Sequence, residues 1–233
     1  MLCRLAAFSF LVAGGMTSAY SQTSVGGGIV TGTRNIAIGG STLTCGPMST
    51  SNYVTYGGGS LLTQSTGAIA YGTEAIAIGS NCSYPTVAAS SSFALGVNAA
   101  AVGSYSFAMG RDSLATGSEA QAWGYGSTAA GTNSMALGSA SSVGNTAQND
   151  GPSALATDGI AIGRLTVVQA SATAGVALGL GATAGAVGST ALGNDTTASG
   201  SSSVAIGGGN GSGAGANAFC ASRSNTDESL PME

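Results

Sequence analysis

The chain has 233 residues, including 40 Gly, four Pro and no His, and its five Lys plus Arg against nine Asp plus Glu give a formal charge of −4. Nucleic-acid binding needs basic residues that neutralise phosphates, and all five basic residues here are Arg, so the composition excludes that class together with Lys-containing phosphate loops. The absence of His excludes His-based catalytic triads and His-ligated metals. With 43% hydrophobic and only 6% charged residues, the composition favours a regular, extended chain built from small side chains.

Residues 1–21 have the pattern of a signal peptide. Arg4 provides a positive charge, residues 5–13 (LAAFSFLVA) form an apolar stretch, and small residues at Ala19 and Ser21 are suitable for cleavage. No later segment reaches ~18 uninterrupted apolar residues, so we expect no direct membrane span in the mature chain. The sequence predicts export from the cytoplasm.

Cysteine usage is compatible with export. Cys3 leaves with the signal peptide, which leaves Cys45, Cys82 and Cys220 in the mature chain. A Cys45–Cys82 disulfide is one pairing open to them, with Cys220 free or paired between chains, and the spacing does not choose between pairings. A metal site is not expected, because there is no C-x-x-C spacing and no His, and no cofactor is predicted.

The most informative feature is a repeat. Between residues 96 and 138 a Gly recurs every seven residues, and an Ala stands two residues before each Gly. The phased pair returns between residues 177 and 207, and isolated copies occur at 37–39, 70–72, 77–79 and 161–163. The residues that flank the Ala are alternately large, as at Phe107 and Met109, and small, so the full repeat has fourteen residues. Fixed periods of this kind are typical of stacked repeat architectures.

A strand explains this repeat better than a helix. Gly in a helix costs ~0.8–1.0 kcal/mol relative to Ala, and a coiled coil would carry one every two turns. Read as a short strand, the two flanking residues point to one face and the Ala to the other, and the Gly then permits a turn. Two strands and two turns would make one coil of a parallel β-solenoid. We expect Phe107 and Trp123 to fill its core, and breaks in the repeat at residues 40–66, 80–92, 139–159 and 164–169.

The repeat resembles the heads of YadA-like trimeric autotransporter adhesins. The resemblance is carried by Asn133-Ser134-Met135-Ala136-Leu137-Gly138 and Ser203-Val204-Ala205-Ile206-Gly207, and by linking elements such as Ser127-Thr128-Ala129-Ala130-Gly131. It implies a left-handed parallel β-roll of fourteen-residue coils that forms a homotrimer on the surface of a Gram-negative bacterium. It also makes residues 133–138 and 203–207 the candidate adhesive motif.

The resemblance divides the chain into four parts. Residues 1–21 are the signal peptide, 22–66 an N-terminal lead-in with one repeat copy and a loop insertion, 67–207 the β-roll head with insertions, and 208–233 a Gly-rich exit and polar tail. The family also has a coiled-coil stalk and a membrane-barrel anchor, and the sequence shows the pattern of neither.

Residues suited to catalysis are not grouped in the sequence. Asp112 and Glu119 occupy equivalent turns half a coil apart, so we expect them on opposite edges of the solenoid as solvated carboxylates. No enzymatic activity is predicted.

The sequence therefore predicts an exported adhesin head, at the outer membrane surface or extracellular, that binds a host extracellular-matrix or cell-surface protein through its repeat face. The alternative is an ice-binding or purely structural surface solenoid, which would carry Thr at a fixed position in every coil. In the sequence Ala holds the fixed position and Thr varies in place.

Overall fold

The computed structural model describes residues 23–25, 29–39, 55–56, 59–60, 68–79, 86–140, 151–209 and 217–218. In this part of the chain every regular element is a β-strand, and no helix is present. The all-β class predicted from the repeat is confirmed. The predicted signal peptide and the three cysteines Cys45, Cys82 and Cys220 lie outside the described residues.

The strands form two parallel sheets of eleven strands each, which we call sheet A and sheet B. Sheet A contains β1 (Thr23–Val25), β3 (Ile36–Ile38), β7 (Ile76–Ile78), β9 (Phe93–Leu95), β11 (Phe107–Met109), β13 (Gln121–Trp123), β15 (Met135–Leu137), β17 (Ile160–Ile162), β19 (Val176–Leu178), β21 (Thr190–Leu192) and β23 (Val204–Ile206). Sheet B contains β2 (Ile29–Thr33), β6 (Ile69–Thr73), β8 (Val87–Ala88), β10 (Ala100–Ala101), β12 (Leu114–Ala115), β14 (Thr128–Ala129), β16 (Ser153–Ala154), β18 (Val167–Val168), β20 (Thr183–Ala184), β22 (Thr197–Ala198) and β24 (Asn217–Ala218). The short strands β4 (Thr55–Tyr56) and β5 (Gly59–Ser60) form a separate antiparallel pair.

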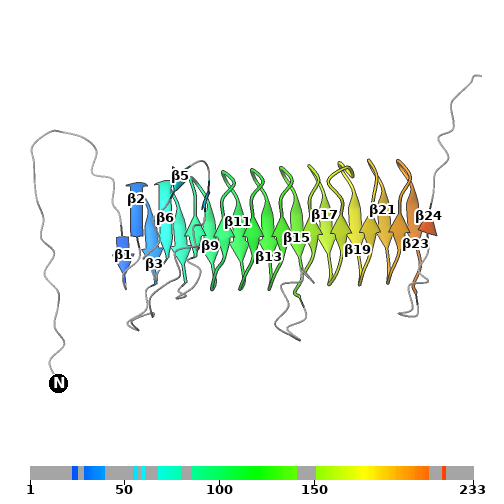
Figure 1. The fold of residues 1–233 in the computed structure, drawn as a ribbon, viewed down its shortest axis with the longest axis horizontal. Coiled ribbons are helices and arrows are strands. Elements are labelled where there is room, and N and C mark those ends of the chain that lie inside the picture. The colour runs from blue at the N-terminus through cyan, green and yellow to red at the C-terminus, as the bar shows by residue number, and fades with distance from the viewer. Residues whose placement is uncertain are drawn as a thin grey trace, which may run out of the picture.

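Successive strands alternate between the two sheets, so the chain winds as a solenoid whose coils follow one another along the long axis (Figure 1). In the uninterrupted part, Phe93 pairs with Phe107 and Phe107 with Gln121, which gives the predicted spacing of about 14 residues per coil. Every strand is therefore hydrogen-bonded to the equivalent strand of the next coil.

The inside of the solenoid is filled by alanine methyl groups. In sheet A, Ala94, Ala108 and Ala122 are fully buried and pair with one another from coil to coil. Sheet B contributes a second row of this kind, in which Ala115 and Ala129 pair. Among the described residues, the largest fully buried side chains are those of two valines, Val87 and Val168. The core is consequently only as wide as methyl groups require.

Phe107 and Trp123 do not fill this core, and that prediction from the sequence is wrong. Residues i and i+2 of a strand share the face opposite to residue i+1, and in these strands Ala108 and Ala122 take the inward position. Trp123 is 36% exposed on the outer face. The prediction assumed that large apolar side chains lie inside, whereas the narrow core admits only small ones.

The turns have a recurring backbone conformation. Asp112, Glu119 and Asn133 have positive φ angles of 55°, 59° and 54°, and each lies in the turn between two strands. Asn and Asp adopt this left-handed conformation more readily than most residues. At the next position the Ser113 hydroxyl donates to the Gly110 carbonyl over 3.0 Å and so closes its turn. Ser127 and Thr166 make the same hydrogen bond, which gives a physical reason for the Ser or Thr that recurs before the sheet B strands.

Gly110 and Gly117 both lie too close to the next coil for a Cβ atom, but only Gly110 also has a positive φ. Gly110, which follows a sheet A strand, has φ of +125°, as the sequence predicts. Gly117, which follows a sheet B strand, has no positive φ, but a Cβ atom built there would lie 2.0 Å from the carbonyl oxygen of Gly131 in the next coil. Its role is to let two backbones approach closely.

The repeat also continues where the sequence predicted breaks. Strand β18 lies within residues 164–169 and pairs in register with β16 and β20, so this segment is no interruption. Strands β8 and β16 lie within two other predicted breaks and are likewise part of sheet B. The sequence signal was lost because Val168 replaces the inward Ala and Ala156 replaces the Gly of the repeat.

The extra residues of the chain enter the solenoid at one edge. The long connections join β3 to β6, β7 to β8, β15 to β16 and β23 to β24, and each runs from a sheet A strand to a sheet B strand. We call this the A-to-B edge. The opposite connections, at the B-to-A edge, are of nearly constant length. The long insertions therefore lie at the A-to-B edge, whereas the B-to-A connections differ by no more than a few residues, as where the one between β18 and β19 is two residues longer than the one between β20 and β21.

The methyl-wide core predicts that enlarging an inward Ala is destabilising. Ala129→Leu should lower the free energy of unfolding by about 1–3 kcal/mol, because Ala129 is fully buried and the core cannot widen without moving a sheet. The control is Ala130→Leu, since Ala130 is the next residue and is exposed. Chemical denaturation followed by circular dichroism, at a fixed protein concentration, measures both. Equal stability of the two variants would contradict the narrow core.

The close approach of the coils predicts that Gly→Ala substitutions at two positions differ in their effect on stability. Gly117→Ala should lower the free energy of unfolding by at least about 1–3 kcal/mol, because its Cβ would overlap the next coil's backbone. Gly208→Ala should change stability by less than about 0.5 kcal/mol, since a Cβ there meets nothing within 4 Å. Thermal melts of the two variants and the parent test this, and a Gly117→Ala melt like the parent's would show that the backbones can separate.

Candidate functional site

Each coil presents four surfaces to its surroundings: the outer faces of sheets A and B, the A-to-B edge and the B-to-A edge. Because the interior is closed by methyl groups, any contact with another molecule must use one of these surfaces. The side chains on each surface recur from coil to coil. We therefore describe the candidate site as surfaces and not as a pocket.

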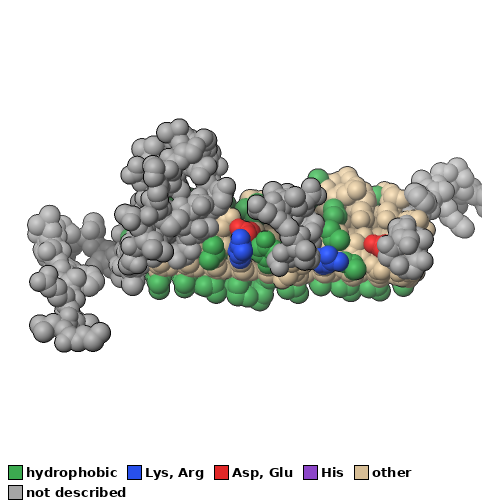
Figure 2. Space-filling view, turned by 60° about the horizontal axis from the view of Figure 1, so that its bottom comes forward, with side chains coloured by type: hydrophobic (Ala, Val, Ile, Leu, Met, Phe, Trp, Pro, Cys, Tyr) green, Lys and Arg blue, Asp and Glu red, His purple; other side chains and the backbone are tan. Residues whose placement is uncertain are grey.

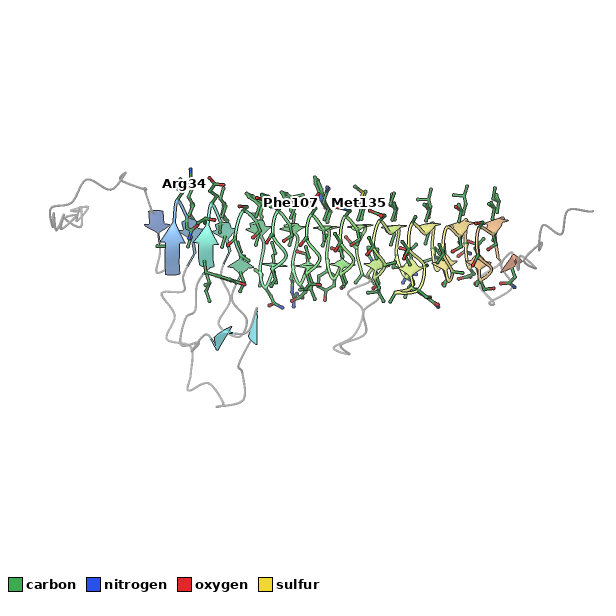
Figure 3. The ribbon with its side chains drawn as sticks, turned by 90° about the horizontal axis from the view of Figure 1, so that it is seen from above. Arg34, Phe107 and Met135 are labelled. Carbon is green, nitrogen blue, oxygen red and sulfur yellow. The ribbon has the colours of Figure 1, made fainter. Side chains whose placement is uncertain are left out.

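The outer face of sheet A is a continuous apolar row. The ten strands of sheet A from β3 to β23 each direct two side chains outward. We call these side chains the apolar row: Ile36, Ile38, Ile76, Ile78, Phe93, Leu95, Phe107, Met109, Gln121, Trp123, Met135, Leu137, Ile160, Ile162, Val176, Leu178, Thr190, Leu192, Val204 and Ile206. None of them is charged, and only Gln121 and Thr190 are polar. Leu137 is 41% exposed and Ile206 66%. Figure 2 shows hydrophobic side chains along one long side of the molecule, and in Figure 3 Phe107 and Met135 project outward on the same side.

An aromatic stack interrupts the aliphatic side chains of the apolar row. The rings of Phe93 and Phe107 are stacked with their centroids 4.9 Å apart and their planes 6° apart. Phe107 also stacks against Trp123, with a centroid distance of 4.9 Å and an interplanar angle of 29°. Phe93 and Phe107 are register partners, whereas Trp123 reaches Phe107 diagonally. The three rings form one block across three successive coils.

The outer face of sheet B has smaller and more polar side chains. Leu114, Thr128 and Thr197 occupy equivalent positions on it, and exposed Thr116 and Ala130 lie two residues further along their coils. The position is Thr in some coils and Ala, Ser, Leu or Val in others, so no Thr file of the ice-binding type runs along this face. On the same sheet, burial raises the pKa of the Tyr71 hydroxyl above its usual value.

The B-to-A edge carries a file of hydroxyl groups that the sequence analysis missed. The residue before the left-handed turn position is Ser or Thr in most coils: Thr73, Ser90, Ser104, Ser118, Thr132, Thr157, Thr173 and Ser201, with Val187 as the exception. Backbone hydrogen bonds align these residues from coil to coil. For example, the Glu119 N–H donates to the Ser104 carbonyl over 2.8 Å. The signal available in the sequence was a Ser or Thr directly after the Gly, or the Ala in its place, that follows most sheet B strands.

Charged groups on the B-to-A edge are few and are partly paired. Arg34 and Glu74 form an ion pair of 2.6 Å between neighbouring coils, and both side chains are about half exposed. Further along, the Asn133 amide donates to the Asp158 carboxylate over 3.2 Å. Tyr105 is 68% exposed on the same edge. With Glu119 and Asp158 added to the Arg34–Glu74 pair, this edge is regular and carries few charges, most of them negative, among the described residues.

The A-to-B edge is less regular. The Arg111 side chain contacts the Asp112 carboxylate over 3.1 Å and lies 5.4 Å from the ring centroid of Tyr125. The Asn98 amide donates to Asp112 over 2.7 Å. Since Asp112 lies on this edge and Glu119 on the other, the two carboxylates are on opposite edges, as the sequence predicts.

The structure separates the residues of the predicted adhesive motif. Ser134, Ala136, Ser203 and Ala205 are buried, whereas Met135, Leu137, Val204 and Ile206 belong to the apolar row. Asn133 lies exposed on the B-to-A edge. Gly138 is half-buried and Gly207 exposed, so a ligand that touched the motif would meet the apolar row, Asn133 or these glycine backbones.

Two further features concern metal ions and membranes. Within the described ranges, no three His, Cys, Asp or Glu side chains are grouped so that they could hold a metal ion. The same part of the chain has no helix that is long and apolar enough to cross a membrane.

Comparison with known protein families finds a match in the regular part of the solenoid. The family model of the YadA head domain repeat matches residues 89–113, 110–134, 170–196 and 184–210. These segments lie in the two stretches where the coil spacing is most regular. Among curated proteins, none matches the chain.

Proposed function

Since the described solenoid is a YadA-like head domain, we propose that the protein is a surface-exposed bacterial adhesin head that binds a host extracellular-matrix or cell-surface protein as a homotrimer. The observation that carries this proposal is the set of YadA head repeats, which occupy neighbouring coils in two stretches of one solenoid. YadA-like heads and β-solenoids of this kind are typically not enzymes.

The apolar row supports assembly of the chain with copies of itself. Large apolar patches on a protein surface mark interaction sites, and this one extends over the whole described length of sheet A. The methyl core supplies little apolar area per coil, and full burial of one large apolar side chain contributes about 1.5–3 kcal/mol. Burial of the apolar row between three subunits therefore supplies stability that a single chain lacks.

Ligand contact then falls to the surfaces outside the apolar row. The B-to-A edge is the regular one, and its hydroxyl groups, together with Asn133, repeat along the solenoid. A single coil would bind weakly, but many equivalent contacts in a trimer raise the effective concentration toward a repetitive, fibrous ligand. Because few charges are available there, the contact should be largely hydrogen-bonded and only weakly sensitive to salt.

The proposed location follows from the family and the sequence. Residues 1–21 would direct export, and the head would be displayed at the outer membrane surface of a Gram-negative bacterium or outside the cell. A disulfide between Cys45 and Cys82 is compatible with that oxidising environment.

A second candidate function is an ice-binding or structural solenoid. The observation that favours it is the file of Ser and Thr at the B-to-A edge, because ice-binding solenoids repeat a hydroxyl at one position. The mixture of Ser and Thr and the interruption at Val187 make the file less uniform than that function would require. An ice-recrystallisation assay on the mature chain distinguishes the two functions.

The proposed trimer predicts that charge on the apolar row prevents assembly. The double variant Leu137→Arg/Ile162→Arg should be monomeric or much more weakly associated, because it places like charges from several subunits in an apolar contact. The matched control is Thr116→Arg/Ala130→Arg, which adds the same charge to exposed positions of neighbouring coils in sheet B. Light scattering at micromolar concentration measures the mass of each. A trimer that survives the first pair of changes would remove the apolar row from the interface.

The proposed adhesion predicts that binding follows the number of coils. Deletion of residues 94–135 removes three whole coils in phase and joins Phe93 to Ala136, whereas deletion of residues 176–203 removes two. Binding of the mature trimer to immobilised matrix proteins should fall in both, and further in the first. Each variant is first checked for its mass and circular dichroism.

Other outcomes of this assay have definite meanings. Full binding by both deletion variants would move the contact to the inserted segments at residues 40–66 or 139–159. Absence of binding by the parent to every matrix and cell surface would leave the protein as a structural solenoid.

A further inference from the structure

A face built from equal coils does not by itself fix how two copies align along their long axis. Neighbouring strands of a sheet lie about 4.7–4.9 Å apart, so a slip by one coil moves each subunit by that distance and again sets apolar residues against apolar residues. Strand register is weakly specified wherever a pattern repeats without distinguishing marks. The apolar row therefore needs a feature that occurs in only some coils.

The apolar row has such a feature in strands β9, β11 and β13. These are the only described strands of sheet A that direct an aromatic side chain outward, namely Phe93, Phe107 and Trp123. On either side the outward residues are aliphatic or Met, apart from Thr190 in β21. Gln121 lies in the same strand as Trp123 and is the other polar residue of the apolar row. The aromatic side chains and the amide thus mark three coils out of ten.

The aromatic residues act as one unit because their rings are stacked. Phe93 and Phe107 cover each other's faces at 4.9 Å and 6°, and Trp123 packs on Phe107 at 4.9 Å. Stacked rings have little freedom to adapt to a differently shaped partner, and aromatic pairs prefer specific geometries. The block is therefore a rigid, bulky step on an otherwise lower aliphatic surface.

A second copy of this chain is the occupant that fits the apolar row. The row is straight, uncharged and periodic, so its partner needs an apolar surface with the same coil spacing, which another copy has. Its two outward side chains on each of ten strands match the roughly 20–30 residues per side of a standard protein interface.

We infer that Phe93, Phe107 and Trp123 fix the axial register in which copies of this chain pack along the apolar row. This inference rests on the proposed homotrimer and adds the residues that align it. In register, each aromatic block meets the blocks of the other subunits, and the Gln121 amides, which both donate and accept, can pair with one another. After a slip, Trp123 and Gln121 would lie against Met and aliphatic side chains, which leaves gaps around the rings and an amide without a partner.

Labels on different coils give a direct readout of register. When one subunit carries a label at Thr116→Cys and another carries a different label five coils away at Ser199→Cys, a slip by one coil changes the axial part of their separation by about 4.7–4.9 Å. Thr116 and Ser199 are exposed, directly follow the sheet B strands β12 and β22, and lie outside the apolar row. Each mature chain has Cys45, Cys82 and Cys220 changed to Ser, and the two chains are labelled separately, one with a nitroxide and one with a gadolinium chelate, before they are refolded together. Pulsed electron paramagnetic resonance between the unlike labels then reports the distribution of label distances.

The test compares two sets of substitutions. Phe93→Ile/Phe107→Ile/Trp123→Ile makes the apolar row nearly uniform and should broaden the single distance of the parent into several that differ by coil offsets. The matched control Ile160→Val/Val176→Ile/Leu178→Ile changes three residues of the same face and should keep one narrow distance. A narrow distance in the aromatic variant would overturn the inference. The inference would also be overturned if the variant without the three aromatic residues were a folded monomer with the parent's circular dichroism. The aromatic block would then strengthen association and would not set the register.

A second variant tests the same inference without removing the rings. Met135→Phe/Leu137→Trp extends the aromatic residues to β15, so a subunit displaced by one coil again sets aromatic against aromatic. This variant should gain a one-coil offset population, and its absence would contradict the inference. A monomeric parent in light scattering would instead refute the homotrimer itself, which keeps the two failures distinguishable.

Discussion

The narrow interior of the coil is the constraint on which the rest of the structure depends. The two sheets are separated by Ala methyl groups, and successive coils approach so closely that a Cβ at Gly117 would overlap the next backbone. Protein interiors are close-packed, so a gap of this width excludes every large side chain. The chain's Ile, Leu, Met, Phe and Trp residues in sheet A must therefore point outward.

This constraint inverts the usual arrangement of a globular domain and connects the fold to its function. A typical domain buries its large apolar side chains, whereas here they form a surface that runs the length of the solenoid (Figure 2). The apolar row favours association between copies, and the remaining surfaces are small, hydrated and repetitive. Such a division suits a head that assembles through one face and meets a ligand through the others.

The parts of the fold that depend on local pattern could be predicted from the sequence. The alternation around Ala108 and the Gly after each strand predicted parallel half-coils, and the structure has them in register. The core could not be predicted in the same way, because the width of the interior is a property of the stacked coils and not of any one strand. For the same reason the repeat pattern wrongly predicts that Phe107 and Trp123 lie inside. The pattern also does not reveal β18, because Val168 replaces the inward Ala and still fits the interior.

The single Trp of the chain gives the most direct test of the account, because Trp123 lies in the middle of the apolar row and is 36% exposed in the isolated chain. The measurement is quenching of Trp fluorescence by acrylamide in the folded protein, across a dilution series followed by light scattering. If the apolar row is buried between subunits, the indole should be protected at trimer concentrations, and protection should fall together with the mass on dilution. A folded trimer whose Trp123 is quenched as freely as an exposed indole would contradict the account.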